Sequence, residues 1–192
     1  MRKTPVILLV LLIFTLVFQS CEGFSKNVKS EVFLQELISV LIDESPIGTS
    51  DNIRQDSIEV LVTKVIDGDT FWVKDGSASY KVRFIGMDTP EIRNSRYKKK
   101  GYYAEEAKSY VQGLTENKKV YLVFDVEKKD RYDRVLAYIY LKDGTFLNAD
   151  LVKNGYAVVA TFPPNVRYAE YFAKLQKQAR QAQVGLWEKE VK

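Results

Sequence analysis

Apolar and polar residues alternate in three short runs between Ile58 and Met87. The runs are IEVLVTKVI (58–66), TFWVKDG (70–76) and SYKVRFIGM (79–87), and an Asp-Gly pair stands at each connection. Alternation over a few residues, bounded by Asp-Gly, is typical of strands joined by tight hairpins. The segment therefore predicts a meander of three antiparallel strands.

Helical and extended patterns follow one another in the next part of the chain. Residues 105–117 repeat apolar positions at helical spacing, and residues 118–127 and 134–148 show two more strand patterns. Further helices are predicted over 148–155 and 167–185. Five strands with one helix between the third and the fourth match the small closed barrel of the oligonucleotide-binding (OB) fold. We predict an α+β domain: a five-stranded OB barrel with three packed helices.

The start of the chain has the pattern of a leader. MRK provides positive charge, and an apolar run from Val6 to Phe18 follows, interrupted only by Thr15. This run suits the core of a signal peptide better than a membrane span, which needs about 20 residues. We therefore predict a signal peptide over 1–20 and an exported protein.

The only cysteine, Cys21, stands directly after Ser20 at the end of this leader. The junction FQSC resembles a bacterial lipobox, in which the cysteine receives a lipid and becomes the mature N-terminus, although Phe18 stands where that motif usually has an aliphatic residue. Cleavage after Ser20 without lipid, or an uncleaved anchor, are the alternatives. We expect the protein either on the outer face of a bacterial membrane, as a lipoprotein, or free as a secreted or periplasmic protein.

Residues 21–57 form a linker of different character. Five of their apolar residues fall on one helical stripe: Phe33, Leu34, Leu37, Ile38 and Leu41. This stripe predicts a short amphipathic helix over 30–42 that packs on the domain, tethers it, lies on the membrane or binds a partner. The polar stretch GTSDNIRQDS then places the domain boundary near Ser57, so the domain covers 58–188 and a tail covers 189–192.

Composition restricts the chemistry of the domain. The chain has 192 residues, of which 46% are hydrophobic, enough for one domain with a real core. It has no histidine and one cysteine, which excludes a Ser-His-Asp triad, a Cys-His pair, a histidine-bound metal and a multi-cysteine zinc site. The net charge of +4 is too small to identify an anionic partner.

Carboxylates gather at the ends of the predicted strands. Asp67 and Asp69 lie in the turn IDGDT, and Asp88 lies in MDTPE after the third strand. Neighbouring strands bring their ends to one rim of a barrel, where carboxylates, a backbone carbonyl and waters suit a hard cation such as calcium. The alternative is that these residues only form a hairpin turn and end a strand.

Two arginines favour a catalytic site at this rim. Alternation in YKVRFI puts Arg83 on the face opposite Val82 and Phe84, and Arg134 precedes the last predicted strand. A guanidinium offers a rigid fork of donors that suits a phosphate and the charge developing on it. With a cation and a spare carboxylate, the arginines predict phosphodiester hydrolysis, whereas each arginine alone would more commonly form a surface ion pair.

The motifs IDGDT, VRFIGMDTPE, DRYDRVLAYIY and VGLW, in this order and at these spacings, resemble those of the thermonuclease, or staphylococcal-nuclease-like, family over most of residues 58–188. The resemblance implies an OB barrel with three helices that cuts DNA and RNA with calcium and leaves 3′-phosphate ends. It makes Asp69, Asp88 and the carbonyl of Thr89 the calcium ligands, with Asp67 supporting them. We expect a monomer that acts on nucleic acid, with single strands preferred.

The same resemblance gives Arg83 and Arg134 the role of holding and stabilising the scissile phosphate, and gives Glu91 the role of orienting or deprotonating the attacking water. The chemistry agrees, because a carboxylate within hydrogen-bond reach of a water is an effective base, and calcium lowers the pKa of that water. No histidine competes with Glu91 for this role.

Substrate contacts are expected from two basic stretches. One is RNSRYKKKGYY, from Arg93 to Tyr103, in which Lys98, Lys99 and Lys100 neutralise phosphates and tyrosines stack on bases. The alternative is a solvated loop whose tyrosines pack on the domain. The other stretch is DRYDR, where Arg131 and Tyr132 are candidates.

The sequence departs from the family pattern at two positions. Asp133 stands where the family usually has glycine, a turn position that aspartate tolerates better than most residues. The stretch Ala160-Thr161-Phe162 replaces a tyrosine that the family often places near the nucleotide, which leaves substrate preference open. The alternatives are a catalytically silent OB-type nucleic-acid-binding lipoprotein and a surface adhesion or interaction lipoprotein. Neither explains the rim residues.

Overall fold

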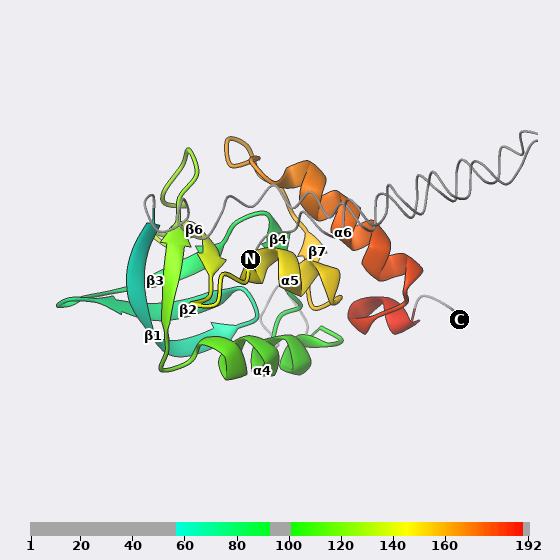
Figure 1. Ribbon diagram of the computed structural model, residues 1–192, viewed down its shortest axis with the longest axis horizontal. Helices are drawn as coiled ribbons and strands as arrows, with labels where there is room; N and C mark the ends of the chain where they lie inside the picture. Colours follow the sequence, from blue (N-terminus) through cyan, green and yellow to red (C-terminus); the bar gives the residue numbers. More distant parts are fainter. Residues whose placement is uncertain (1–56, 93–100, 190–192) are drawn as a thin grey trace, which may run out of the picture. The chain divides into compact units, whose positions relative to one another are not determined.

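The computed structural model describes residues 57–92 and 101–189 (Figure 1). The elements are β1 (Ser57–Asp67), β2 (Thr70–Asp75), β3 (Ala78–Phe84), β4 (Met87–Asp88), α4 (Ala104–Thr115), β5 (Lys119–Val123), β6 (Val135–Tyr140), α5 (Leu147–Lys153), β7 (Val158–Val159), α6 (Ala169–Gln181) and the 3-10 helix η1 (Gly185–Lys189). The predicted leader, Cys21, the 30–42 helix and Lys98 to Lys100 lie outside the described residues. No helix in the described ranges is long and apolar enough to cross a membrane.

Five strands form a closed barrel in the order β1-β2-β3-β6-β5, with β5 pairing back to β1. All neighbouring pairs are antiparallel except β3 and β6, which are parallel. A parallel pair needs a long crossover, and here the chain supplies it with α4 and β5. The barrel and its three helices confirm the predicted fold.

The barrel interior is filled by alternate residues of its strands. Val60, Val62 and Val65 of β1 are buried, as are Val82 and Phe84 of β3. The register of β1 against β2 shifts between Val62 and Lys64, so two successive residues, Thr63 and Lys64, are exposed before the inward pattern resumes at Val65.

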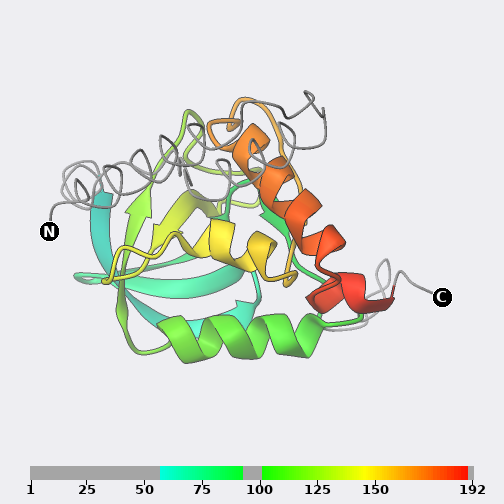
Figure 2. The same ribbon diagram turned by 45° about the vertical axis from the view of Figure 1, so that its right-hand side comes forward.

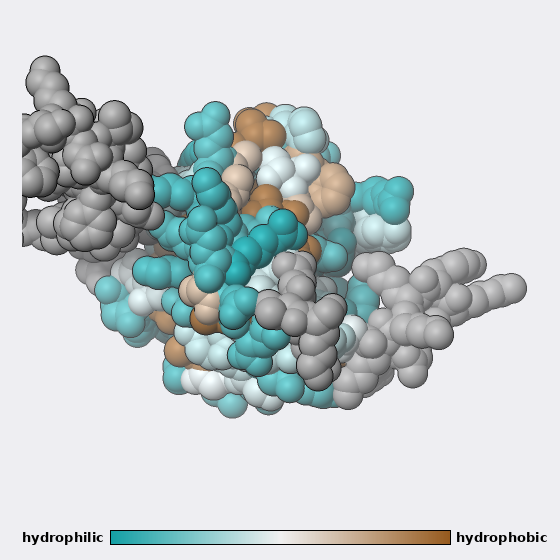
Figure 3. All heavy atoms as spheres, turned by 90° about the vertical axis from the view of Figure 1, so that its right-hand side faces the viewer, coloured by the Kyte–Doolittle hydropathy of each residue, from teal (hydrophilic) through white to brown (hydrophobic). Residues whose placement is uncertain are grey.

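Three helices pack around part of the barrel. α4 packs against β1, and α5 packs against both β6 and α6 (Figure 2). Buried Asn148 of α5 accepts a hydrogen bond from the Ile139 amide (2.8 Å) and donates to the Ile85 carbonyl (2.9 Å). This side chain therefore joins the end of β3 to β6. Seen from the right-hand side of Figure 1, the surface carries hydrophilic side chains with smaller hydrophobic patches between them (Figure 3).

The third predicted strand was expected to continue to Met87, and this boundary is wrong. β3 ends at Phe84, because Gly86 has a left-handed backbone (φ 81°) and its Cα approaches the ring of Phe172 so closely that a Cβ would lie 2.5 Å from it. After this turn, β4 pairs with β7 through Met87 and Val159. The short β4–β7 sheet holds the residues that follow Met87 at the end of the barrel.

Candidate active site

A cavity of about 270 Å³ opens where the β1–β2 turn, the end of β3, β4 and the segment before β6 meet. Its walls consist of Asp67, Asp69, Thr70, Arg83, Asp88, Thr89, Pro90, Glu91, Tyr132 and Arg134. The structure thus brings together every predicted metal, catalytic and supporting residue. Of the predicted substrate contacts, Tyr132 lines the cavity and Arg131 does not.

Asp69 is the most enclosed carboxylate of this cavity, with a relative exposure of 2%. It accepts hydrogen bonds from the Thr70 hydroxyl (2.9 Å), the Thr89 amide (2.8 Å) and the Thr89 hydroxyl (3.1 Å). The close approach of the two segments requires Gly68, since a Cβ there would lie 2.8 Å from the Thr89 methyl group. The turn IDGDT is therefore fixed against the segment that follows β4.

Arg83 places its guanidinium between two carboxylates. It forms ion pairs with buried Asp69 and with Asp88 (2.5 Å), and it donates to the Met87 carbonyl at 3.3 Å. Its neighbours on β3, Val82 and Phe84, point into the barrel, as alternation predicted. The two carboxylates predicted as cation ligands therefore converge on a single positive group.

Asp67 lies behind Asp69 in the same turn. Its Oδ1 accepts a hydrogen bond from the Asp69 amide at 3.2 Å. Burial raises the pKa of Asp67 above its ordinary value, and the nearby Arg83 charge offsets only part of this effect. Asp67 therefore contacts the backbone of Asp69 and not its carboxylate.

Glu91 is held at the cavity wall by its backbone. Its carbonyl accepts a hydrogen bond from the Gly101 amide at 2.9 Å. Gly101 packs directly on Pro90, with no room for a side chain between them. The two ends of the segment between Glu91 and Gly101 are thus joined beside the cavity.

Arg134 is positioned by Asp130, a residue that the sequence analysis did not select. The carboxylate of Asp130 pairs with the guanidinium (2.7 Å) and accepts from the backbone amides of Tyr132 (2.9 Å) and Arg134 (3.0 Å). Burial alone would raise the pKa of Asp130, but these hydrogen bonds and the Arg134 charge hold it below its ordinary value. The only hint in the sequence was that Asp130 and Arg134 carry opposite charges four residues apart, a spacing that indicates an ion pair in a helix, and this segment is not helical.

Tyr132 is the exposed edge of this part of the cavity, with a relative exposure of 64%. The Arg134 guanidinium lies 5.5 Å from the centre of its ring, and the Arg131 guanidinium lies 4.8 Å from it. Arg131 also donates to the Tyr132 hydroxyl at 2.8 Å. Two cations and one aromatic ring therefore stand together at the mouth.

Asp133 has a left-handed backbone (φ 60°), a conformation that costs most L-residues about 1–2 kcal/mol and glycine nearly nothing. Its ion pair with Lys129 (2.6 Å) is exposed and contributes little. We expect Asp133→Gly to raise the free energy of unfolding by about 0.5–1 kcal/mol and Asp133→Ala to lower it by about 1 kcal/mol, measured by urea denaturation. A glycine variant less stable than the alanine variant would contradict this explanation.

Comparison with known proteins gives concordant matches. The model of the family described as staphylococcal nuclease homologue matches residues 81–189. The chain is 33% identical to the thermonuclease of Staphylococcus intermedius over 186 residues, 97% of each chain. It is 37% identical to the thermonuclease of Staphylococcus hyicus over 126 residues, 66% of this chain and 73% of that one. It is also 32% identical to endonuclease YncB of Bacillus subtilis over 151 residues, 76% of this chain and 70% of that one.

Proposed function

Because the chain belongs to the staphylococcal nuclease family, we propose that it is a calcium-dependent nuclease that cuts DNA and RNA and leaves 3′-phosphate ends. The observation that carries this proposal is the convergence of two carboxylates, two arginines and Glu91 on one cavity. Relatives named thermonuclease and endonuclease support the same class of reaction.

The donor set of the cavity fits a hard cation. Asp69 and Asp88 both direct their carboxylates at one positive group, the Arg83 guanidinium. Thr89 directly follows Asp88 in the chain, and its amide donates to Asp69. Among the described residues, no three Asp, Glu, His or Cys side chains form a cluster able to hold a metal, so a cation here would need carbonyl and water oxygens as well. Calcium accepts such a mixed oxygen shell in loose geometry.

In the proposed mechanism, Asp69, Asp88 and the Thr89 carbonyl would hold the cation, and the Arg83 guanidinium binds the phosphate. The bound cation would neutralise phosphate charge and lower the pKa of a nearby water. Arg83 and Arg134 orient the phosphate from two sides and stabilise the charge that increases on its oxygens in the transition state. Asp130 keeps Arg134 in place and stays ionised, consistent with its low pKa.

Glu91 accepts a proton from the attacking water as the water oxygen forms a bond to phosphorus. The bond between phosphorus and the 5′ oxygen breaks, the leaving oxygen takes up a proton, and the products are a 3′-phosphate and a 5′-hydroxyl. We also propose that the protein acts outside the cytoplasm, as a lipoprotein anchored at Cys21 or as a secreted protein, and that it is a monomer; only the sequence of the leader supports the location.

Cleavage of single-stranded and double-stranded DNA by the purified full chain tests this function. We expect cutting in calcium, no cutting in a calcium chelator, and products whose 3′ ends become extendable by a polymerase only after phosphatase treatment. A folded protein that binds DNA but never cuts it in calcium would instead favour a silent nucleic-acid-binding barrel.

A further inference from the structure

The outward face of β2 and β3 continues directly from the cavity. Three cross-strand pairs follow one another along it: Thr70–Arg83, Trp72–Lys81 and Lys74–Ser79. Because side chains alternate along a strand, all six point to the same face as Arg83. Each pair is about 7 Å beyond the previous one, so the surface extends about 14 Å from Arg83.

β1 adds a third column to this face. Lys64 is paired with Trp72 and Leu61 with Lys74, and the register shift after Val62 is what turns Lys64 outward. Lys64, Lys74 and Lys81 are all exposed, and Trp72 is partly buried. We call these four residues the lysine–tryptophan face.

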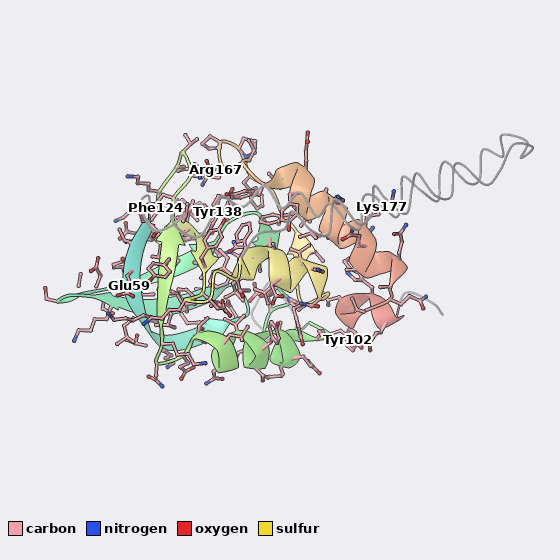
Figure 4. All side chains as sticks on the ribbon, in the orientation of Figure 1. Glu59, Tyr102, Phe124, Tyr138, Arg167 and Lys177 are labelled. Atoms are coloured by element: carbon pink, nitrogen blue, oxygen red, sulfur yellow. The ribbon has the colours of Figure 1, made fainter. Side chains whose placement is uncertain are left out.

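The lysine–tryptophan face combines positive charge with an aromatic ring. The Lys81 ammonium lies 5.3 Å from the centre of the Trp72 ring. Glu59 of β1, labelled in Figure 4, pairs with Lys119 of β5 at 2.6 Å, and Asp75 stands at the end of β2, next to the hairpin. Within the described ranges, none of the three lysines forms an ion pair with a carboxylate.

We propose that the lysine–tryptophan face binds single-stranded nucleic acid beyond the scissile phosphate. Lys64, Lys74 and Lys81 pair with successive phosphates, and a base stacks on Trp72, the two interactions by which single strands bind without sequence preference. This inference rests on the proposed function, because it assumes that the scissile phosphate lies at Arg83 and that the strand continues from there along β2 and β3. It predicts that long substrates use the face and that dinucleotides do not reach it.

The main test compares two triple variants of the full chain. One replaces Lys64, Lys74 and Lys81 with glutamine, and the control replaces Lys153, Lys174 and Lys177, three exposed lysines of α5 and α6, with the same loss of charge (Figure 4 shows Lys177 on α6). Binding of an oligonucleotide of about 12 nucleotides is measured in a calcium chelator at several salt concentrations. We expect the first variant to bind about tenfold more weakly, with a salt slope reduced by about 2, and the control to bind like the wild type.

Cleavage in calcium gives a second readout. The first variant should raise KM for the oligonucleotide about tenfold, leave kcat unchanged, and cut a dinucleotide substrate at the wild-type rate. A structural defect would instead affect both substrates. Equal loss on the dinucleotide would overturn the proposal.

Tryptophan fluorescence tests whether a base of the oligonucleotide stacks on Trp72. The chain has two tryptophans, and Trp187 is only 5% exposed, so quenching by an added oligonucleotide should come from Trp72 and disappear in Trp72→Phe. Absence of this quenching, an unchanged salt slope in the lysine variant, or quenching by anionic vesicles but not by the oligonucleotide would each overturn the proposal. If the face binds DNA as expected but the protein never cuts it, the proposed function fails and the binding face stands.

Discussion

Glu91→Gln is expected to lower kcat for DNA cleavage by about 10²- to 10⁴-fold, the range that a positioned general base contributes. Glutamine has nearly the same shape as glutamate but cannot accept the proton of the attacking water. The backbone hydrogen bond between the Glu91 carbonyl and the Gly101 amide does not depend on the side chain, so the variant should fold normally. Single-turnover cleavage of a labelled oligonucleotide in calcium measures the effect, and thermal unfolding checks the fold.

The matched control for this variant is Glu170→Gln, which makes the same change at an exposed position in the first turn of α6. It should cut DNA at the wild-type rate. If Glu91→Gln keeps the wild-type kcat, Glu91 does not activate the water, and the role would pass to another group of the cavity.

Arg83→Lys is expected to reduce kcat by about 10²- to 10³-fold, comparable to the loss of one oriented donor to a transition-state oxygen. The guanidinium contacts Asp69 and Asp88 with separate nitrogens, and a lysine offers a single ammonium without this fork. Lysine is preferred to alanine for the test because it leaves buried Asp69 near a positive charge; removing one partner of a buried ion pair costs about 3–5 kcal/mol. We therefore expect a large decrease in kcat and only a small decrease in the free energy of unfolding.

Arg167→Lys provides the comparison for this second variant. Arg167 pairs with Asp125 at 3.7 Å, and neither residue lines the cavity. We expect wild-type kcat and a small change in the free energy of unfolding, measured by urea denaturation. Equal kcat in Arg83→Lys and the wild type would show that the fork of donors is not required for catalysis.

The barrel could be predicted from sequence because its strands alternate cleanly. In β3, Val82 and Phe84 are buried and Arg83 faces the cavity, as period-two spacing requires. The β4–β7 pair could not be predicted, because two residues are too few to show a period. β3 ends three residues earlier than predicted, before the left-handed turn at Gly86, and the need for glycine there comes from the ring of Phe172 in α6, which no local pattern reveals.

The sequence motifs predicted which residues line the cavity, but they did not predict which of these residues form ion pairs with one another. Alternation gives the face on which Arg83 lies and says nothing of its partners, Asp69 and Asp88. Arg134 reaches the cavity only because β6 pairs in parallel with β3, a long-range contact that no local pattern specifies. Asp130 was missed because its ion pair with Arg134 closes an irregular turn, where spacing rules for helices and strands do not apply.

The hydrogen bond between Glu91 and Gly101 has a consequence for how such a protein can be altered. It fixes the distance between the two ends of the segment that joins those residues, beside the cavity. The entropic cost of closing a loop grows slowly, by about 0.6 kcal/mol for each doubling of its length. A change in the number of residues between Glu91 and Gly101 should therefore cost little stability, provided that Pro90 and Gly101 are kept.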